Sequence, residues 1–382
     1  MKRIGIITIH NSPNYGACLQ SFALYEYLRQ CGHDVEIIDL HRPAHADYIE
    51  SKRFTPFTHR FENGFRKMKR IFKTYIKRLI GRGEKAETCN TAFHGTLGLF
   101  SSINGAIRLS RPFRGIDELY SNPPQYDTYI TGSDQVWNPT QAYCIEPYFL
   151  TFVKSGRKIS YASSIGIEKL TESEKRKFKK WLSSYDSISV REATAQKFLE
   201  QLTGKDVACV ADPTFLLDRD SWKEMAVKPG IDDYILVFTL GYEKHIVDYA
   251  LGLSEESGKK LVVLGVEQPA PEGYIAVTDA TAQQWLGYIA NADMVITDSF
   301  HCTVFSIILQ AKRFFTYISP WNDRGSRIVD LLSRFGLEEN LLDIQLTQSY
   351  ETLEMIAPAY DRIKHVFNEE QSGSREFLIE NI

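Results

Sequence analysis

Residues that could hold and protonate an anion lie where a predicted strand gives way to a helix. Asp298-Ser-Phe-His301 directly follows the β-branched strand predicted at 294–297. Asp298 or Ser299 can cap the next helix, which places His301 in its first turn. Because that helix is apolar and therefore buried, its N-terminus should face the ligand-binding edge of the sheet. We predict a functional role for His301, with an ordinary structural histidine as the alternative.

Three arginines occupy similar positions. Arg191 begins a helix after the strand predicted at 187–190, and Arg324 and Arg327 lie in the segment NDRGSR. The planar fork of arginine matches phosphate and carboxylate groups, and an anion with several negative charges needs several forks. Surface ion pairing explains any one of these arginines taken singly. The Gly-Ser pair beside Arg327 favours a ligand there.

A turn near the N-terminus carries groups that could bind hydroxyls. In the segment NYGA, Asn14 and Tyr15 precede Gly16, and Gln20 follows one turn later. Asn14 and Gln20 offer hydrogen bonds, and Gly16 lets the backbone come close to a ligand. The segment is not GxGxxG, so it predicts no dinucleotide site. An ordinary turn and helix cap explains it equally well.

The segment GSDQVWN, at 132–138, gathers polar side chains around a tryptophan. Asp134 and Gln135 could pair with sugar hydroxyls, while the apolar face of a sugar stacks on an aromatic ring such as that of Trp137. The alternative is a capped helix start with Trp137 in the core.

The elements that must position these residues alternate between strand and helix. The pattern predicts one α/β series with strands at 3–10, 35–40, 126–131, 158–163, 187–190 and 207–210, and a second with strands at 234–240, 260–264, 294–297 and 313–317. The alternation lapses around 218–233. We therefore predict two Rossmann-like domains, 1–218 and 219–382, that face each other across a cleft, with ligands at the carboxyl ends of the strands.

Composition limits the class of protein further. A chain of 382 residues suits two domains, and a net charge of −3 gives no indication of nucleic-acid binding. The six cysteines include no CxxC pair and are typical of reduced thiols, so we expect no disulfide framework and no metal site. The first apolar run is too short for a signal peptide, and no stretch reaches the roughly 20 apolar residues of a spanning helix. We expect a cytoplasmic protein.

One segment is far more basic than the chain as a whole. Residues 52–85 carry twelve Lys/Arg against two Asp/Glu. Near 65–80 the apolar residues fall on one face and the basic residues on the others, which predicts a basic amphipathic helix. Such a helix suits the anionic inner face of the plasma membrane. Docking on the protein's own core is the alternative.

In order and spacing, these segments resemble the polysaccharide pyruvyl transferase family. The matching stretches are NYGA with LQSFAL, TGSDQVWN, SVRE, ADP, DSFH and GSRI, which run from residue 4 to about residue 336. The resemblance implies a fold similar to the GT-B glycosyltransferases, with the acceptor on the first domain and the donor, phosphoenolpyruvate, on the second. By the same resemblance His301 is the catalytic histidine, and Arg191 and Arg327 bind the donor; we place Arg324 and Ser299 with them. Cys302 departs from the family, where many relatives carry glycine or alanine.

The chemistry that this resemblance implies is transfer of pyruvate as a ketal to a sugar, carried on a polyprenyl diphosphate at the inner leaflet. The enol ether of the donor must be protonated, two hydroxyls must lose protons, and phosphate must leave. His301 suits the acid, or an electrostatic clamp on phosphate, and Asp134 or Asp298 suits the base. A helix N-terminus disfavours a protonated histidine, which a bound anionic donor would offset. No step calls for a cofactor or a metal.

Two other functions remain open at this point. A nucleotide-sugar glycosyltransferase of the same fold would be expected to carry a ribose-binding carboxylate in the second domain, and no clear one is found. A non-catalytic, membrane-associated scaffold of a glycan assembly complex is the other. The presence of His301 with both arginines argues against the scaffold.

Overall fold

The computed structural model describes residues 1–12, 14–42, 45–51, 107–141, 146–167, 169–241, 243–265, 273–319, 325–356, 358 and 360–382. The predicted basic helix near 65–80 lies outside these residues, and so does Arg324.

The first half is built on a parallel sheet. Its strands are β1 (Arg3–Ile7), β2 (Asp34–Ile37), β3 (Thr128–Thr131) and β4 (Arg157–Ser160), in the order β2-β1-β3-β4. A second parallel pair, β5 (Ile188–Val190) and β6 (Val207–Cys209), continues beside β4 through isolated bridges. The helices of this half are α1 (Tyr15–Gln30), α4 (Ile116–Ser121), α5 (Glu172–Leu182) and α6 (Ala193–Thr203).

The second half has a five-stranded parallel sheet in the order β11-β10-β7-β8-β9. Its strands are β7 (Tyr234–Phe238), β8 (Lys260–Leu264), β9 (Ile275–Val277), β10 (Met294–Thr297) and β11 (Phe314–Thr316). Its helices are α8 (Lys244–Ser257), α9 (Ala282–Asn291), α10 (Phe300–Leu309), α11 (Ser326–Phe335) and α12 (Tyr350–Met355).

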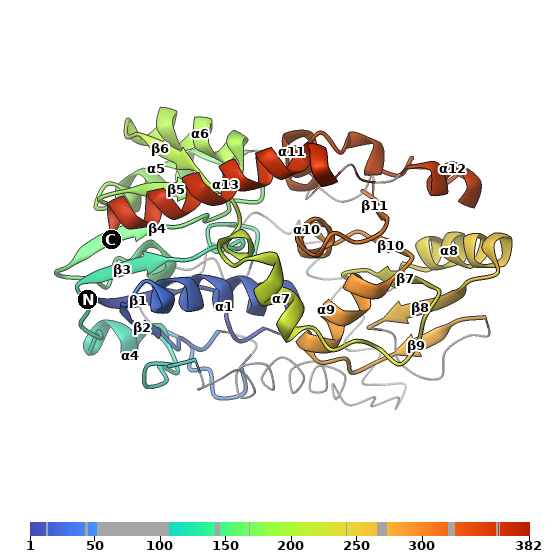
Figure 1. The fold of residues 1–382 in the computed structure, drawn as a ribbon. Coiled ribbons are helices and arrows are strands. Elements are labelled where there is room, and N and C mark those ends of the chain that lie inside the picture. Colours follow the sequence, from blue (N-terminus) through green and yellow to red (C-terminus); the bar gives the residue numbers. More distant parts are fainter. Residues whose placement is uncertain are drawn as a thin grey trace, which may run out of the picture.

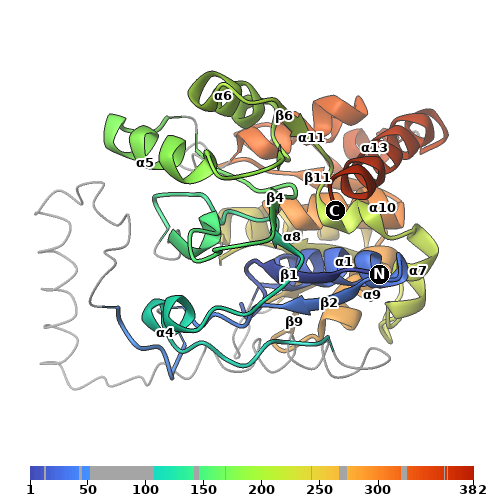
Figure 2. The same ribbon diagram turned by 90° about the vertical axis from the view of Figure 1, so that its left-hand side faces the viewer.

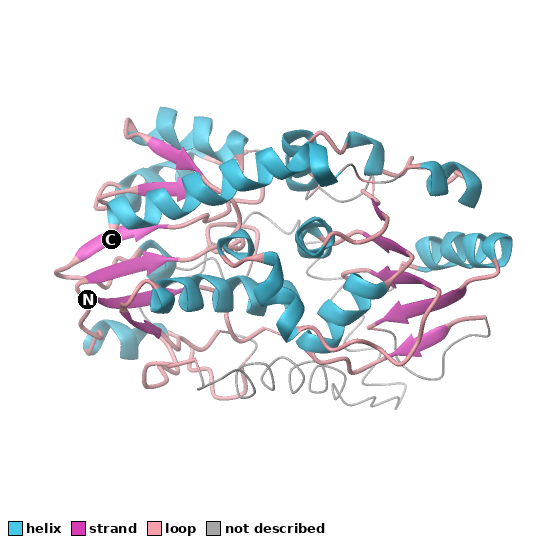
Figure 3. Ribbon diagram, in the orientation of Figure 1, coloured by secondary structure: helices cyan, strands magenta, loops and turns pink. Residues whose placement is uncertain are grey.

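The predicted α/β class is therefore confirmed: every ladder between named strands is parallel, and helices cover the sheets (Figure 3). Strands such as β7 and β10 are almost entirely apolar and β-branched or aromatic because both of their faces are buried. The strands of the two halves point toward one another in Figure 1, so their carboxyl ends meet in the middle of the molecule.

A shared aromatic core joins the two halves. Trp222 lies in α7 (Arg219–Met225), a short helix in the region where the sequence pattern lapses. Its ring packs against Phe22 of α1 at 6.0 Å and against Phe305 of α10 at 4.9 Å, measured between ring centroids. Trp285 of α9 contacts Phe305 as well, at 5.5 Å. Burying rings of this size contributes roughly 2–3 kcal/mol each, so the halves are held firmly together.

The C-terminal helix crosses back over the first half. α13 (Tyr360–Asn381) runs from α11 to the strands β4 and β5, and the two termini lie near each other (Figures 1 and 2). Ser374 Oγ accepts a hydrogen bond of 2.8 Å from the backbone N–H of Ala211, and Phe377 packs on Tyr161. By position this helix belongs to the predicted second domain, and it contacts both halves: Tyr360 donates to the backbone oxygen of Ala311 at 2.7 Å in the second, and Ser374 accepts from Ala211 in the first.

No helix in the described ranges has the length and apolar character needed to cross a membrane.

Candidate active site

His301 opens a helix that is buried along its whole length. All ten residues of α10 are buried, and the helix begins where β10 ends. Ser299 is the N-cap, and its side chain accepts a hydrogen bond from the backbone N–H of Cys302. This cap is the role in which the structure places Ser299. His301 therefore lies in the first turn, at the junction of the two halves, and is only 7% exposed.

Asp212 is the centre of the charged cluster around this histidine. Arg191 Nη1 donates to Asp212 Oδ2 at 2.6 Å, and His301 Nε2 lies 3.5 Å from the same oxygen. The carboxylate is fixed locally as well, because Asp212 caps a short 3-10 helix (Pro213–Leu216) and accepts from the backbone N–H of Thr214. Burial alone would raise the pKa of Asp212, but the charges of His301 and Arg191 outweigh it and hold the pKa well below its ordinary value.

The sequence pattern predicts no catalytic or binding role for Asp212. Its signal is the Ala-Asp-Pro turn directly after β6, a carboxylate at the same edge of the sheet as Arg191. Strand, Asp-Pro turn and helix together could have placed it at the ligand-binding edge.

Two arginines from opposite halves flank one aromatic ring. The guanidinium of Arg191 lies 4.5 Å from the ring centroid of Phe300, and that of Arg327, which belongs to α11, lies 5.5 Å from it. Gln135 faces Arg327, and in the amide orientation that satisfies both side chains its oxygen accepts from Nη2 at 3.0 Å and from Nη1 at 3.2 Å. The structure thus brings Arg191, Arg327 and His301 together with Gln135 around the interface.

Carboxyl groups balance part of this positive charge. Asp134 Oδ1 lies 3.6 Å from Arg191 Nη2, and Glu192 Oε1 lies 3.7 Å from Arg191 Nε. Burial raises the pKa of Glu192 above its ordinary value, against the opposing effect of Arg191. The sequence pattern predicts no role for Glu192, and the structure makes it a second group in the cluster that could hold a proton.

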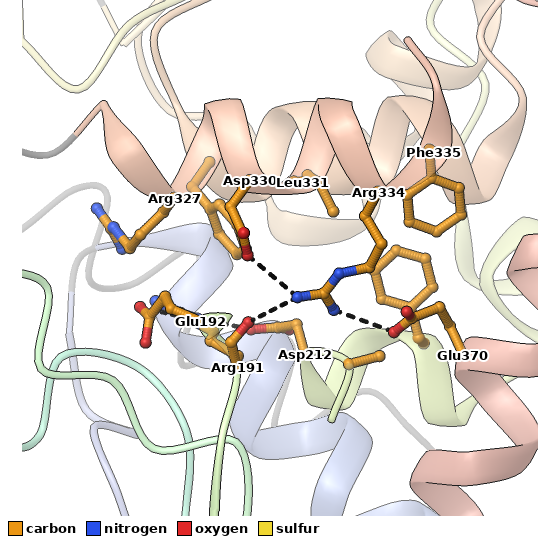
Figure 4. A pocket seen from close by; sticks show the side chains of 12 residues that line it. Arg191, Glu192, Asp212, Arg327, Asp330, Leu331, Arg334, Phe335 and Glu370 are labelled. Atoms are coloured by element: carbon orange, nitrogen blue, oxygen red, sulfur yellow. Dashed lines mark hydrogen bonds and ion pairs between the residues drawn. The ribbon is translucent and has the colours of Figure 1, made fainter. Parts of the chain in front are cut away.

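A narrow pocket opens beside this cluster (Figure 4). Its lining includes Arg191, Glu192, Asp212, Phe300, Arg327 and Arg334. Arg334 lies on the side facing α13, where it pairs with Asp330 at 3.1 Å and Glu370 at 3.0 Å, and it donates to the backbone oxygen of Arg191 at 3.3 Å. This arginine therefore ties α11 and α13 to the segment that carries Arg191.

Gly16 lets the N-terminus of α1 approach the N-terminus of α10 closely. A Cβ atom built on Gly16 would lie 2.2 Å from Cγ of His301, which no side chain can occupy without displacing the imidazole. The preceding residue, Tyr15, stacks on Trp285 and donates a hydrogen bond of 2.6 Å to the backbone oxygen of Ala280. The close approach that Gly16 was expected to offer a ligand is occupied by His301 itself.

Three of the residues predicted to bind an acceptor have internal roles. Asn14 caps α1 by accepting from the backbone N–H of Ala17 at 3.1 Å. Gln20 is buried and donates to Thr8, Ile9 and Ala17. Trp137 is 0% exposed, stacks on Phe149 at 5.5 Å and donates to the backbone oxygen of Tyr148. Its ring lies in the core and presents no face on which a sugar could stack.

The two aspartates predicted as bases lie in different surroundings. Asp134 adopts the left-handed conformation, with φ of 68°, and is next to Arg191. Asp298 accepts from the backbone N–H of Leu240 at 2.8 Å, at the end of β7. Burial, with a smaller contribution from Glu243, raises the pKa of Asp298 to about 6. Asp298 thus points to a neighbouring strand end, whereas Asp134 lies beside Arg191 in the charged cluster around His301.

In the described part of the chain, no group of three or more His, Cys, Asp or Glu side chains is arranged to hold a metal ion.

A sequence profile of the family described as polysaccharide pyruvyl transferase matches residues 14–316. Among curated protein sequences, none matches this chain at a significant level. Solved structures that are similar to it include the UDP-GlcNAc 2-epimerase from Methanocaldococcus jannaschii, at 12% identity and a TM-score of 0.51 over 99% of both chains. A glycotransferase of kitacinnamycin matches at 11% identity and a TM-score of 0.51, over 100% of this chain and 99% of the other. S. aureus MnaA with UDP matches at 10% identity and a TM-score of 0.51, over 99% and 95%. At such identities the likeness shows the fold alone, which is that of the GT-B enzymes.

Proposed function

The chain belongs to the polysaccharide pyruvyl transferase family, and from this premise we propose that it moves the pyruvyl group of phosphoenolpyruvate onto a sugar of a polysaccharide precursor, as a ketal, with release of phosphate. The family indicates a transferase of polysaccharide biosynthesis. The donor, the ketal product and a lipid-linked acceptor are our proposals.

The observation that best supports this donor is that the guanidinium groups of Arg191 and Arg327 both lie close to the ring of Phe300, at 4.5 and 5.5 Å from its centroid. His301 is nearby, because its Nε2 lies 3.5 Å from the Asp212 carboxylate that accepts from Arg191. Phosphoenolpyruvate carries a phosphate and a carboxylate on one small carbon frame. Two guanidinium groups from opposite halves could each take one of these anions. The flat enol would then lie near the imidazole.

The protons taken up and released balance in this reaction. One proton is added to the methylene carbon of the donor, which leaves a cation at C2 that a sugar hydroxyl attacks. The carbon–oxygen bond to phosphate then breaks, and a second hydroxyl forms the ketal. The two hydroxyls release two protons, and the new methyl group and the departing phosphate take up one each. His301 is the proposed acid, and its Nε2 lies 3.5 Å from the Asp212 carboxylate.

An assay of phosphate release tests the proposal directly. The protein is incubated with phosphoenolpyruvate and a galactose- or mannose-type acceptor, and phosphate and the sugar product are measured together. We expect phosphate and ketal in equal amounts, and neither when acceptor or donor is left out. UDP release from a UDP-sugar in a parallel reaction, with no phosphate from phosphoenolpyruvate, would replace this function by glycosyl transfer.

The same assay tests the requirement for a metal. Because the donor already carries its leaving group and arginines can hold its anions, we expect activity to survive exhaustive treatment with EDTA. The measurement is the initial rate before and after chelation, with EDTA removed by gel filtration as a control for inhibition by the chelator. Complete loss that a divalent cation restores would contradict the arginine-based donor site.

A further inference from the structure

A buried carboxyl group beside the proposed donor site has no role in the mechanism above. Glu192 is 5% exposed and lines the same pocket as Arg191 and Arg327. Figure 4 shows Glu192 and Arg327 on one side of this pocket and Glu370 on the other. Glu192 is also the N-cap residue of α6, but its side chain makes no hydrogen bond to the helix. The helix therefore leaves this carboxyl group available to a ligand in the pocket.

The two oxygens of Glu192 have different surroundings. Oε1 accepts a hydrogen bond from Ser164 Oγ and lies 3.7 Å from Arg191 Nε. Oε2 is buried and has no hydrogen-bond partner among the described residues. A buried polar atom without a partner is costly, and such atoms are usually satisfied by water or a ligand. One oxygen thus meets two donor groups, and the other meets none.

This asymmetry fits a neutral carboxyl group. A carboxylate can only accept hydrogen bonds, so it would need donors at both oxygens, whereas a carboxylic acid has one accepting oxygen and one hydroxyl that donates. Because Ser164 and Arg191 both direct donor groups at Oε1, Oε1 is the accepting oxygen in the neutral form and Oε2 carries the hydrogen. What Oε2 lacks is therefore an acceptor.

The surroundings of Glu192 favour the neutral form. Burial raises the pKa of its carboxyl group, and the charge of Asp330 on α11 acts in the same direction. Arg191, Arg327 and the hydrogen bond from Ser164 oppose this rise but do not outweigh it. The pKa of Glu192 therefore lies above its ordinary value, and the neutral form persists to higher pH than it does in an exposed glutamate.

Arg191 does not need Glu192 as a counterion. Asp212 Oδ2 lies 2.6 Å from Arg191 Nη1, and Asp134 Oδ1 lies 3.6 Å from Nη2. A third ionised carboxylate next to the same guanidinium would leave an excess of negative charge where an anion of the donor must bind, and like charges at this range repel. A neutral Glu192 removes that repulsion and adds a hydrogen-bond donor.

The chemistry of the pocket selects the ligand that Oε2 meets. The acceptor must lie beside the guanidinium groups of Arg191 and Arg327, which exclude a cation and favour an anion. A hydrogen bond from a hydroxyl group to an anionic oxygen is short and roughly twice as strong as one between neutral groups. A phosphate or carboxylate oxygen therefore fits the open position at Oε2.

We propose that Glu192 binds the donor in its neutral form, by donating a hydrogen bond from Oε2 to an anionic oxygen of phosphoenolpyruvate held by Arg191 and Arg327. The inference rests on the proposed function. The proton stays on Oε2 while the donor is bound and is not consumed by the transfer. Because only the neutral form can donate, donor affinity falls once the pH rises above the pKa of Glu192 in the free protein, by up to about ten-fold per pH unit.

Replacing Glu192 by Gln tests this role, because the amide oxygen can accept from Ser164 while the amide N–H group donates near the position of Oε2 and never ionises. The measurement is the Kd of phosphoenolpyruvate by calorimetry, from about pH 5 to pH 9. We expect E192Q to match the unmodified protein within about two-fold at the acidic end and to bind at least about ten-fold more tightly at the alkaline end. Taking the ratio of the two Kd values cancels the ionisation of the donor itself.

A second variant and a control complete the design. Glu192→Met has a similar length but cannot donate, so its Kd should be about ten-fold or more above that of the unmodified protein at the acidic end. Glu174→Gln is the matched control. Glu174 is also 5% exposed, and it forms the capping box of α5, which glutamine can form as well. This control should bind the donor as the unmodified protein does at every pH.

The outcomes separate the two proposals. If the unmodified protein neither binds phosphoenolpyruvate nor releases phosphate from it, the proposed function is refuted, and this inference with it. Normal binding and release, with a Kd ratio between E192Q and the unmodified protein that stays constant over the pH range, would overturn the role of Glu192 alone. An equal loss of affinity in E192Q and Glu192→Met at the acidic end would make Glu192 an ionised partner of Arg191 and would also overturn it.

Discussion

Replacing His301 by Asn should lower kcat for pyruvyl transfer by about a hundred- to ten-thousand-fold, the usual contribution of a general acid and roughly 3–5 kcal/mol of barrier. Asn has a similar polar end but cannot deliver a proton to the methylene carbon. Donor affinity should change far less than turnover, because the anions of the donor are held by Arg191 and Arg327. The measurements are initial rates at saturating donor and donor titration by calorimetry.

Arg327→Ala is the informative contrast. It removes a guanidinium that would pair with bound donor before any reaction, so the donor KM should rise strongly whatever happens to kcat. Both variants must first show a normal thermal transition, since His301 belongs to a buried helix and its loss could loosen the second half. Near-normal turnover of H301N at saturating donor would make the histidine a binding or structural residue and would refute the mechanism.

Adding a single methyl group at Gly16 should lower kcat almost as much as replacing His301 does. Gly16→Ala places a carbon 2.2 Å from Cγ of His301, so the imidazole or the start of α1 must move. A misplacement of about 1 Å at a reacting group costs on the order of a hundred-fold in rate. We therefore expect kcat to fall about a hundred-fold. Overpacking should destabilise the fold by roughly 1–3 kcal/mol, which can be followed by chemical unfolding.

The matched control for Gly16→Ala is Gly252→Ala, in the middle of α8. A Cβ there meets no atom within 4 Å, and alanine favours a helix over glycine by up to about 1 kcal/mol. This control should keep full activity and gain slightly in stability. Full activity in Gly16→Ala would show that the position of His301 beside α1 does not matter for the reaction.

The order of strands and helices could be predicted because each long element carries its own apolar period. β10 and α10, for example, combine a β-branched run, a capping serine and an apolar helix within sixteen residues. The shorter pieces could not be predicted in this way. α7 has seven residues, and its packing depends on Trp222, whose partners Phe22 and Phe305 lie far away in sequence.

The same holds for the site: residues that follow a local sequence pattern could be predicted, and those placed by contacts distant in the sequence could not. Arg191, His301 and Arg327 could be proposed because each follows a predicted strand or turn, and the parallel topology gathers such positions. The surroundings of Trp137 could not, because its stacking partner Phe149 comes from a short irregular segment with no pattern of its own. Nor does any local signal show that Asp212, rather than Asp298, would lie between an arginine and the histidine.

The return of α13 over the first half also bears on how the chain folds as it is made. The turn that carries Asp212 is held by α13, through Ser374 at Ala211 and through Arg375, which donates to the backbone oxygen of Leu216 at 2.6 Å. On the ribosome, residues 1–217 emerge long before residues 360–381. The N-terminal sheet can begin to assemble early, but the turn that carries Asp212 lacks its contacts with α13 until the second half has been synthesised. A nascent fragment that ends before residue 360 therefore lacks the contacts that hold the Asp212 turn.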